Sequence, residues 1–276
     1  MNVKIVSTFL LVFGGLSLRA QELYVFSDPA SNVPAKSISI KYSGKFLKNT
    51  HHTNRVEQRH TPEVMLGLNK NWMLRAAASF SDMYTSNVRF ESARLYAKYR
   101  FLSNDQVHKH FRMAAFAELA GSRNDVQYDE LSLSGDQSGV QAGIIATQLW
   151  NKLAVSATGS VLQVLSDKPK VYPDNNTYTS FNYSLSAGYL VLPFHYTSYK
   201  QTNLNLYAEL LGQQSLDQKR FFVDFAPAVQ LIFNSAHKVN FGYRFQLDGD
   251  MQRMSKNSFH VSVESLFLNV LNRKKS

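Results

Sequence analysis

The chain has 276 residues, no cysteine and a formal net charge of +10 at neutral pH. The lack of cysteine excludes a disulfide framework and a lipid-modified cysteine anchor. Beyond residue 20 no apolar run approaches the roughly twenty residues that a spanning helix needs, which excludes a helical membrane protein. A membrane β-barrel is not excluded, because it places apolar side chains at only every second position.

The first twenty residues predict an export signal. Lys4 gives a positive start, the stretch 5–18 is mostly apolar, and the small residue Ala20 precedes Gln21. An uncleaved anchor is the alternative, but an apolar core of about fourteen residues is too short to span a bilayer as a helix. We therefore expect residues 1–20 to be a signal peptide. Because no linker rich in Pro, Gly or Ser divides residues 21–276, we expect them to form a single domain.

Alternation of apolar and polar residues is the main signal of secondary structure in the rest of the chain. In 93–101 the odd positions are apolar and the even ones carry Arg, Tyr or Lys, and 181–191 and 239–247 repeat the pattern. Most such segments have about ten residues, the length that a tilted strand needs to cross a bilayer. We expect twelve strands, near 36–47, 62–69, 72–81, 89–101, 111–121, 138–149, 153–164, 181–192, 203–212, 221–233, 239–247 and 258–269.

Long polar connections and short turns alternate along the chain. The long ones are 48–61, 122–137, 165–180 and 248–257, and the tight ones are 70–71, 150–152 and 234–238; the connections 82–88 and 193–202 fit less well. A barrel with both termini in the periplasm has long outer loops and short inner turns. The pattern predicts an all-β fold, a transmembrane antiparallel up-and-down β-barrel of about twelve strands. Pro227 predicts a bulge or kink within its strand.

Aromatic side chains stand near many of the expected strand ends, where a ring suits the lipid headgroup boundary. They are Trp72, Tyr84, Phe90, Phe101, Phe111, Trp150, Phe181, Phe194, Tyr196, Phe221, Phe233 and Phe267. Core packing in a soluble β protein is the alternative. The last expected strand ends on Phe267, which resembles the terminal signal read by the barrel-assembly machinery. We expect this machinery and outer-membrane lipid as partners, and the bacterial outer membrane as the location.

Charged positions within the expected strands should point into the lumen, because a charge on the lipid face costs roughly 2 to 4 kcal/mol near the midplane. One interpretation is a pore lining with a basic excess that prefers anions or aromatic acids. The other is a network of Arg and Glu pairs that fills a narrow lumen. The expected lining residues are Glu63, Arg94, Lys98, Arg100, Arg112, Glu118, Glu209, Arg244 and Glu264.

The positive charge does not indicate a nucleic-acid-binding protein. Without Lys4 and Arg19 the formal charge is +8, which favours anionic solutes through long-range attraction. The cations alternate with apolar residues along strands instead of gathering on one basic face. We expect small solutes, and no nucleic acid, as ligands.

Histidines offer only a weak indication of a metal site. His51, His52 and His60 lie in one expected loop, and His108 and His110 lie in a turn at the other end. Imidazoles close in sequence can bind a transition metal, but no adjacent carboxylate or fixed ligand spacing accompanies them. We expect no metal and no cofactor.

A barrel-wall lipid hydrolase is the least favoured alternative. His260 and Ser262 stand two residues apart on one face, and outer-membrane phospholipases use Ser and His on a twelve-stranded barrel. The following Val263 and Glu264 lack the Ser-Asn-Gly context of that family. We expect no catalytic residue and no enzyme.

Three segments, 22–27, 37–44 and 199–206, resemble uncharacterised outer-membrane barrels of Bacteroidota-type bacteria. Some of those are similar to the barrels of phenol meta-pathway (MetA-like) transporters. The resemblance implies an outer-membrane location and names no solute. We expect a passive channel or transporter for small solutes, anionic or aromatic, and the alternative is a plugged structural or binding barrel that acts through its surface loops.

Overall fold

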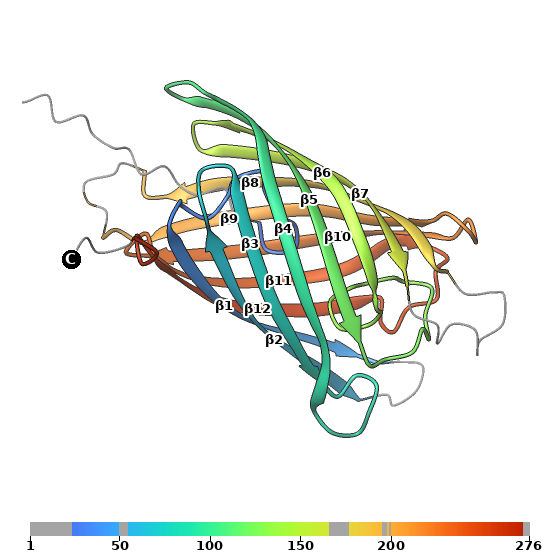
Figure 1. Ribbon diagram of the computed structural model, residues 1–276. Coiled ribbons are helices and arrows are strands. Elements are labelled where there is room, and N and C mark those ends of the chain that lie inside the picture. The colour runs from blue at the N-terminus through green and yellow to red at the C-terminus, as the bar shows by residue number, and fades with distance from the viewer. Residues whose placement is uncertain (1–23, 50–54, 166–176, 195–197, 199, 273–276) are drawn as a thin grey trace, which may run out of the picture.

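A closed antiparallel barrel of twelve strands forms the computed structural model, which describes residues 24–49, 55–165, 177–194, 198 and 200–272 (Figure 1). Each strand pairs with its neighbours in sequence, and β12 pairs with β1 to close the wall. The strands are β1 Ser37–Lys48, β2 Val56–Gly67, β3 Trp72–Ser81, β4 Arg89–Asp105, β5 Lys109–Ser122, β6 Gly139–Trp150, β7 Leu153–Val164, β8 Thr179–Leu192, β9 Asn203–Ser215, β10 Phe221–Phe233, β11 His237–Gly249 and β12 Asn257–Phe267. The predicted fold class is confirmed. Among the described residues there is no helix long and apolar enough to cross a membrane.

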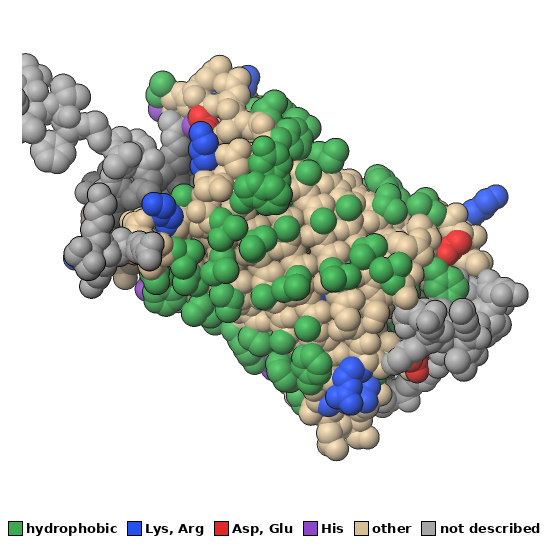
Figure 2. Space-filling view, viewed as in Figure 1, with side chains coloured by type: hydrophobic (Ala, Val, Ile, Leu, Met, Phe, Trp, Pro, Cys, Tyr) green, Lys and Arg blue, Asp and Glu red, His purple; other side chains and the backbone are tan. Residues whose placement is uncertain are grey.

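The wall has an apolar outside because successive side chains of a strand point to opposite faces. On β4, Leu95 is 63% exposed and the next residue, Tyr96, is 5% exposed; on β6, Ile144 is 53% and Ile145 is 1% exposed. Figure 2 shows apolar side chains spread over the wall, with charged ones gathered at its two ends. A surface of this kind is stable in lipid and not in water.

The two ends of the barrel differ in their connections. β1 begins and β12 ends at the same end, which we call the termini end; it also carries the connections 68–71, 106–108, 151–152, 193–202 and 234–236. The opposite end, the loop end, carries the connections 49–55, 82–88, 123–138, 165–178, 216–220 and 250–256. The hairpin of β4 and β5 extends beyond the rest of the wall at the termini end (Figure 1).

Two local predictions about strands are wrong. β2 begins at Val56 and not at 62, because its pairing with β1 continues through Pro62, while the pairing with β3 skips Thr61 and Pro62. The bulge expected at Pro227 lies at Val223 and Asp224 instead. Proline has no N–H to donate to a neighbouring strand. At Pro227, β10 and β11 therefore leave out one stretch of pairing and continue in the same register.

Of the aromatic residues expected at the lipid boundary, most are exposed on the outside, including Trp72, Phe90 and Trp150. Tyr84 is an exception, because its hydroxyl donates a hydrogen bond to Asp136 inside the barrel, at 3.0 Å. Tyr196 lies outside the described residues, as do the expected signal peptide and the pair His51 and His52.

Two segments outside the wall enter the lumen. Residues 24–36, the N-terminal segment, lie within the ring of strands, where Tyr24 and Val25 pack against Leu149 and Tyr207. Residues 123–138, the constriction loop, fold inward from the loop end. Leu131 and Leu133 of this loop are nearly fully buried and pack against residues of β5 and β7. The space that remains between these two segments is the candidate functional site.

Candidate functional site

Among the cavities that the described residues line in the lumen are three with volumes of about 30, 410 and 50 Å³. The central cavity of about 410 Å³ is lined by Tyr24 to Asp28 of the N-terminal segment and by Glu130 to Ser134 of the constriction loop. Its volume holds on the order of ten water molecules. The small cavity of about 30 Å³ shares Lys45, Arg59, Glu130 and Arg244 with it, and the cavity of about 50 Å³ shares Tyr24, Asp28, Lys41 and Arg75.

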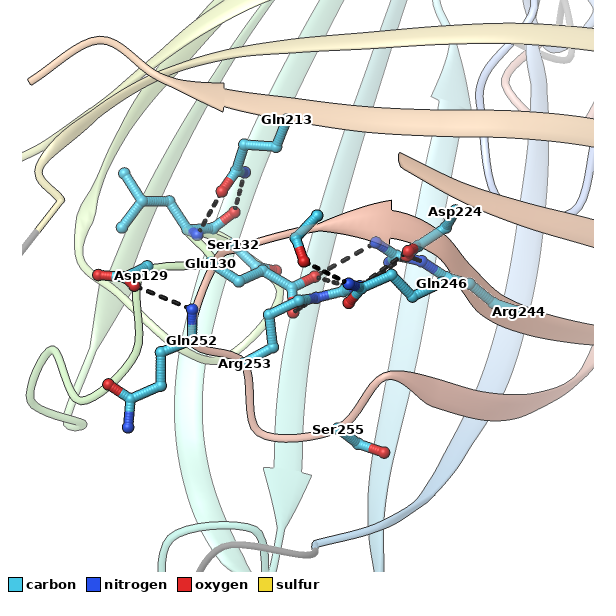
Figure 3. Close-up of polar contacts among 12 residues, drawn as sticks. Asp129, Glu130, Ser132, Gln213, Asp224, Arg244, Gln246, Gln252, Arg253 and Ser255 are labelled. Carbon is cyan, nitrogen blue, oxygen red and sulfur yellow. Dashed lines mark hydrogen bonds and ion pairs between the residues drawn. The ribbon is translucent and has the colours of Figure 1, made fainter. Parts of the chain in front are cut away.

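The constriction loop crosses the barrel and is held on the far wall by a cluster of charges (Figure 3). Arg253, from the connection 250–256, donates to both oxygens of Asp224 on β10, each at 2.8 Å. The same guanidinium donates to Glu130 of the loop at 2.9 and 3.1 Å. Arg244 on β11 binds the same two carboxylates. Since β11 stands six strands from β5, the loop reaches the opposite side of the wall.

Further contacts fix the course of the loop. The side-chain amide of Gln213 on β9 accepts a hydrogen bond from the backbone N–H of Leu131 and donates one to its carbonyl oxygen, both at 2.8 Å (Figure 3). Arg59 on β2 donates to Asp136 at 2.6 Å and to Glu91 at 3.0 Å. Burial raises the pKa of the Glu130 carboxyl, but Arg253 and Arg244 outweigh this effect and hold the pKa well below its usual value. Glu130 is therefore ionised at neutral pH.

The N-terminal segment is held by side chains from several strands. Glu209 on β9, fully buried, accepts the backbone N–H groups of Val25, Phe26 and Ser27 at 2.9, 3.0 and 2.9 Å. Lys98 on β4 donates to the carbonyl oxygens of Pro29 and Ser31, both at 2.8 Å.

An ion pair completes the attachment of the segment, between Asp28 and Arg75 on β3. Burial raises the pKa of Asp28, but the nearby Arg75 and Lys98 outweigh burial and hold the pKa below its usual value. Asp28 therefore presents a carboxylate to the wall at neutral pH.

The nine expected lining residues divide into three groups by position. Those that line the central cavity are Glu63, Arg94, Glu118 and Arg244. Lys98, Glu209 and Arg112 instead contact the N-terminal segment, and Glu264 is paired with Lys238 at 3.0 Å beside the cavity of about 50 Å³. Arg100 lies at the termini end and donates to the carbonyl oxygen of Lys70 at 2.6 Å, so it lines none of the three cavities.

The expected cations are mostly neutralised by nearby acids. Arg94 donates to Glu118 at 2.9 Å and to Glu63 at 3.2 Å, and Arg244 is held by Asp224 and Glu130. Pairs of this kind fix side chains in one geometry and leave little free charge for a solute. The acids that sequence reasoning missed are Asp28, Glu91, Glu130, Asp136 and Asp224.

Two lysines that sequence reasoning missed stand out in the central cavity. Lys41 and Lys45 project inward from β1, about 13 Å apart along the strand at its rise per residue. Within the part of the chain that the structure describes, neither ammonium group makes a hydrogen bond or an ion pair within 4 Å. The alternation of Ile38, Ile40 and Tyr42 with polar residues is the signal that would have placed both lysines inside.

Formal charges on the cavity wall have a basic excess. The described lining has six cationic side chains, Lys41, Lys45, Arg59, Arg75, Arg94 and Arg244, and four acidic ones, Asp28, Glu63, Glu118 and Glu130. On either side of Lys45 in the sheet stand Arg59 and His260, and no acid pairs with it across the strands. By contrast, Lys41 is flanked by Glu63 and Glu264.

The histidines are dispersed. His60 lies on the outer face, where its ring accepts or donates a hydrogen bond to the Tyr42 hydroxyl at 2.7 Å, and His110 pairs with Asp105 at 2.6 Å. The described residues include no group of three or more His, Asp or Glu side chains placed to hold a metal ion. His260 lines the central cavity, and Ser262 is buried on the same inner face. Neither side chain faces lipid.

Comparison with known proteins bears on the fold. No protein-family model matches the sequence, and no curated protein matches it. The chain is similar to the COG4313 outer membrane channel from Pseudomonas putida F1, with 13% identity over 87% of this chain and 100% of that one and a TM-score of 0.55. The chain is less similar to the KdgM porin, with 9% identity over 82% of this chain and 98% of that one and a TM-score of 0.47.

The Escherichia coli outer membrane phospholipase A gives 11% identity over 86% and 98% of the two chains, with a TM-score of 0.41. At such identities the likeness concerns the fold alone. The barrel fold and the apolar outer face both indicate a protein that spans the outer membrane. The chain is an outer-membrane β-barrel.

Proposed function

We propose that this barrel is a passive outer-membrane channel for small anionic solutes. The observation that carries the proposal is the central cavity of about 410 Å³, into which Lys41 and Lys45 project without an ion-pair partner among the described residues. A partly buried ammonium group without a counter-ion is costly, and a passing anion lowers that cost. The similar fold of a protein described as an outer membrane channel supports the proposal.

The spacing of the two lysines suits movement and not tight retention. At about 13 Å apart, each lysine can attract an anion in turn, so that a solute binds weakly at two successive places. At about 5 Å in water one charge attracts an anion by roughly 0.8 kcal/mol and repels a cation by the same amount, which corresponds to about a sixteenfold preference for anions over cations. Lys45 stands where the central cavity meets the small one, and Lys41 where it meets the cavity of about 50 Å³.

The finer form of the proposal is that the solutes are aromatic acids. Phe26, Phe116, Tyr183 and Phe222 line the same cavity as the lysines, so an apolar body and a carboxylate both find contacts there. Benzoate added to one side of a bilayer should therefore interrupt the chloride current more often than acetate does at equal concentration.

The main test is single-channel recording in planar bilayers, with the reversal potential measured across a salt gradient. Wild-type protein should be anion-selective. Lys41→Gln and Lys45→Gln should each lower the anion preference by up to about sixteenfold, because each removes a positive charge that has no ion pair within 4 Å among the described residues. Arg94→Gln is a comparison variant within the lumen. The charge of Arg94 is already balanced by ion pairs with Glu63 and Glu118, and the substitution leaves both carboxylates without this partner.

A charge-matched control is Lys70→Gln, which removes a lysine from an exposed turn at the termini end. Selectivity should be unchanged in this variant. If the double variant of Lys41 and Lys45 conducted with wild-type selectivity, the assignment of anion preference to these lysines would be wrong. A folded barrel that never conducts would overturn the channel itself.

A folded barrel that never conducts would favour a structural or binding role. A specific observation supports this second candidate. The N-terminal segment and the constriction loop occupy the lumen from opposite ends, and most inner charges are paired. A lipid hydrolase is less well supported, because His260 and Ser262 point into the barrel, away from the lipid that such an enzyme would cleave.

A further inference from the structure

The N-terminal segment belongs to the lumen without belonging to the wall. Strand pairing begins at Ser37, and the twelve pairings that close the barrel involve no residue of 24–36. The segment passes close to the wall at Gly67, where a Cβ atom would lie 2.1 Å from the carbonyl oxygen of Pro34. The barrel therefore needs this segment for none of its backbone hydrogen bonds between strands.

Side chains of opposite walls hold the segment in the middle of the lumen. Glu209 on β9 and Arg75 on β3 stand six strands apart in the wall, and they bind adjacent parts of the segment. Thr147 on β6 accepts the backbone N–H of Ala30 at 2.9 Å. A chain segment held across the lumen in this way obstructs the path between the central cavity and the termini end.

The attachment at Glu209 involves more hydrogen bonds with the segment than that at Lys98 or Thr147. One carboxylate oxygen accepts the N–H groups of Val25 and Phe26, and the other accepts the N–H of Ser27 and the hydroxyl of Ser186, the last at 3.1 Å. Both oxygens are needed, because three backbone donors converge on a single side chain.

We propose that residues 24–36 form a displaceable plug, which closes the channel at the termini end and is latched by the Glu209 carboxylate. Backbone hydrogen bonds join the plug to the rest of the chain at its last residue, Lys36, which donates to the carbonyl oxygen of Gly67 and accepts the N–H of Leu271. The contacts that hold Val25 to Asn32 run to side chains or to a turn carbonyl, and water can replace them when this part of the plug leaves. The proposal rests on the channel function proposed above and adds a closed state to it.

The test uses protein purified from outer membranes and recorded in planar bilayers. Because the chain has no cysteine, Ser27→Cys together with Ser186→Cys introduces the only pair of thiols. The two hydroxyl oxygens that the thiols replace lie 2.8 Å apart, so oxidation can join the plug to β8. The oxidised protein should remain in its low-conductance state, and reduction should restore wild-type gating. The two single-cysteine variants are the controls for oxidation.

Two variants test whether release of the plug opens the channel. Deletion of residues 24–31 should give a channel fixed at the high conductance level. Glu209→Gln replaces one acceptor oxygen with a donor, so at least one N–H loses its acceptor, and the ratio of open to closed time should rise about tenfold or more. Glu57→Gln is the matched control, since Glu57 is equally buried but binds Asn49 at the loop end.

The outcomes separate the plug from the channel. If the oxidised cysteine pair conducted as the reduced pair does, or if a folded deletion variant conducted no more than wild type, the plug would be refuted and the channel would stand. If neither wild type nor the deletion variant conducted, both proposals would fail. A deletion variant that does not fold leaves the decision to the cysteine pair, which keeps the whole segment.

Discussion

Replacement of Arg253 by Met should both destabilise the barrel and loosen its constriction loop. Arg253 is 4% exposed and makes four hydrogen bonds with the carboxylates of Asp224 and Glu130. At an effective dielectric constant near 20, each of these ion pairs has a Coulomb energy of about 4 kcal/mol. Desolvation of the guanidinium offsets several kcal/mol of this sum.

The net loss should therefore fall in the range of about 3 to 5 kcal/mol that is typical when one partner of a buried ion pair is removed. Arg253 also lies over the ring of Phe222, with 3.8 Å to its centroid, and Met keeps part of this packing. Arg244 still binds both acids in the variant, which places the loss toward the lower end of the range.

Urea unfolding in lipid vesicles, followed by the fluorescence of Trp72 and Trp150, measures the change in unfolding free energy. Arg220→Met is the comparison, because Arg220 pairs with one carboxylate, that of the buried Asp129, and is itself 38% exposed, so its removal should cost less than that of Arg253. A loss below about 1 kcal/mol for Arg253→Met would refute the reasoning, since it would mean that water already screens the cluster. Asp224→Asn combined with Arg253→Met should recover part of the loss, because it removes the orphaned carboxylate.

Three further predictions concern other parts of the barrel. Glu130 has a native pKa below its unfolded value of about 4.3, so its stabilising effect is complete above that pH and is lost as the pH falls further; unfolding free energies measured from pH 7 to pH 3 should fall less steeply in Glu130→Gln. Gly67→Ala should push the N-terminal segment from its place, because a Cβ would meet the backbone of Pro34 and Val33, and single-channel records should show a larger open fraction than wild type. Ile144→Arg, in the middle of the outer face of β6, should cost about 2 to 4 kcal/mol of unfolding free energy in lipid, whereas Gln141→Arg on the inner face of the same strand should cost under about 1.5 kcal/mol.

The wall of the barrel was predictable from the sequence because one physical rule determines it. Lipid outside and water or polar groups inside require opposite side chains at successive positions, and this alternation located all twelve strands. The largest error was the start of β2, where Gln58 and His60 point outward beyond the apolar region and no longer follow the alternation. Strand pairing can extend past the membrane, and there the rule gives no information.

The interior was less predictable, for two different reasons. Lys41, Lys45 and Asp224 lie in strands that were expected, so their positions followed from the alternation, although they were not singled out. Glu130, Asp136 and Arg253 lie in connections, which are polar whether they face the lumen or the surrounding water. Nothing periodic in such a segment indicates that it folds inward, and the partners of Arg94 and Arg244 depend on that fold.

The two segments within the lumen differ in how they could respond to a solute. Release of the constriction loop would separate Glu130 from two guanidinium groups and break the paired amide contacts of Gln213, so several charges would lose their partners together. Release of the N-terminal segment would take hydrogen-bond partners from Glu209 and Lys98 and would separate Asp28 from Arg75, beside a cavity large enough for water. Among the described residues, the first change breaks the ion pairs of Glu130 with Arg244 and Arg253, of Asp136 with Arg59 and of Asp129 with Arg220, whereas the second breaks that of Asp28 with Arg75. The first change therefore costs more. We therefore assign the proposed movement to the N-terminal segment, while the constriction loop stays in place and lines the central cavity together with Lys45 of β1.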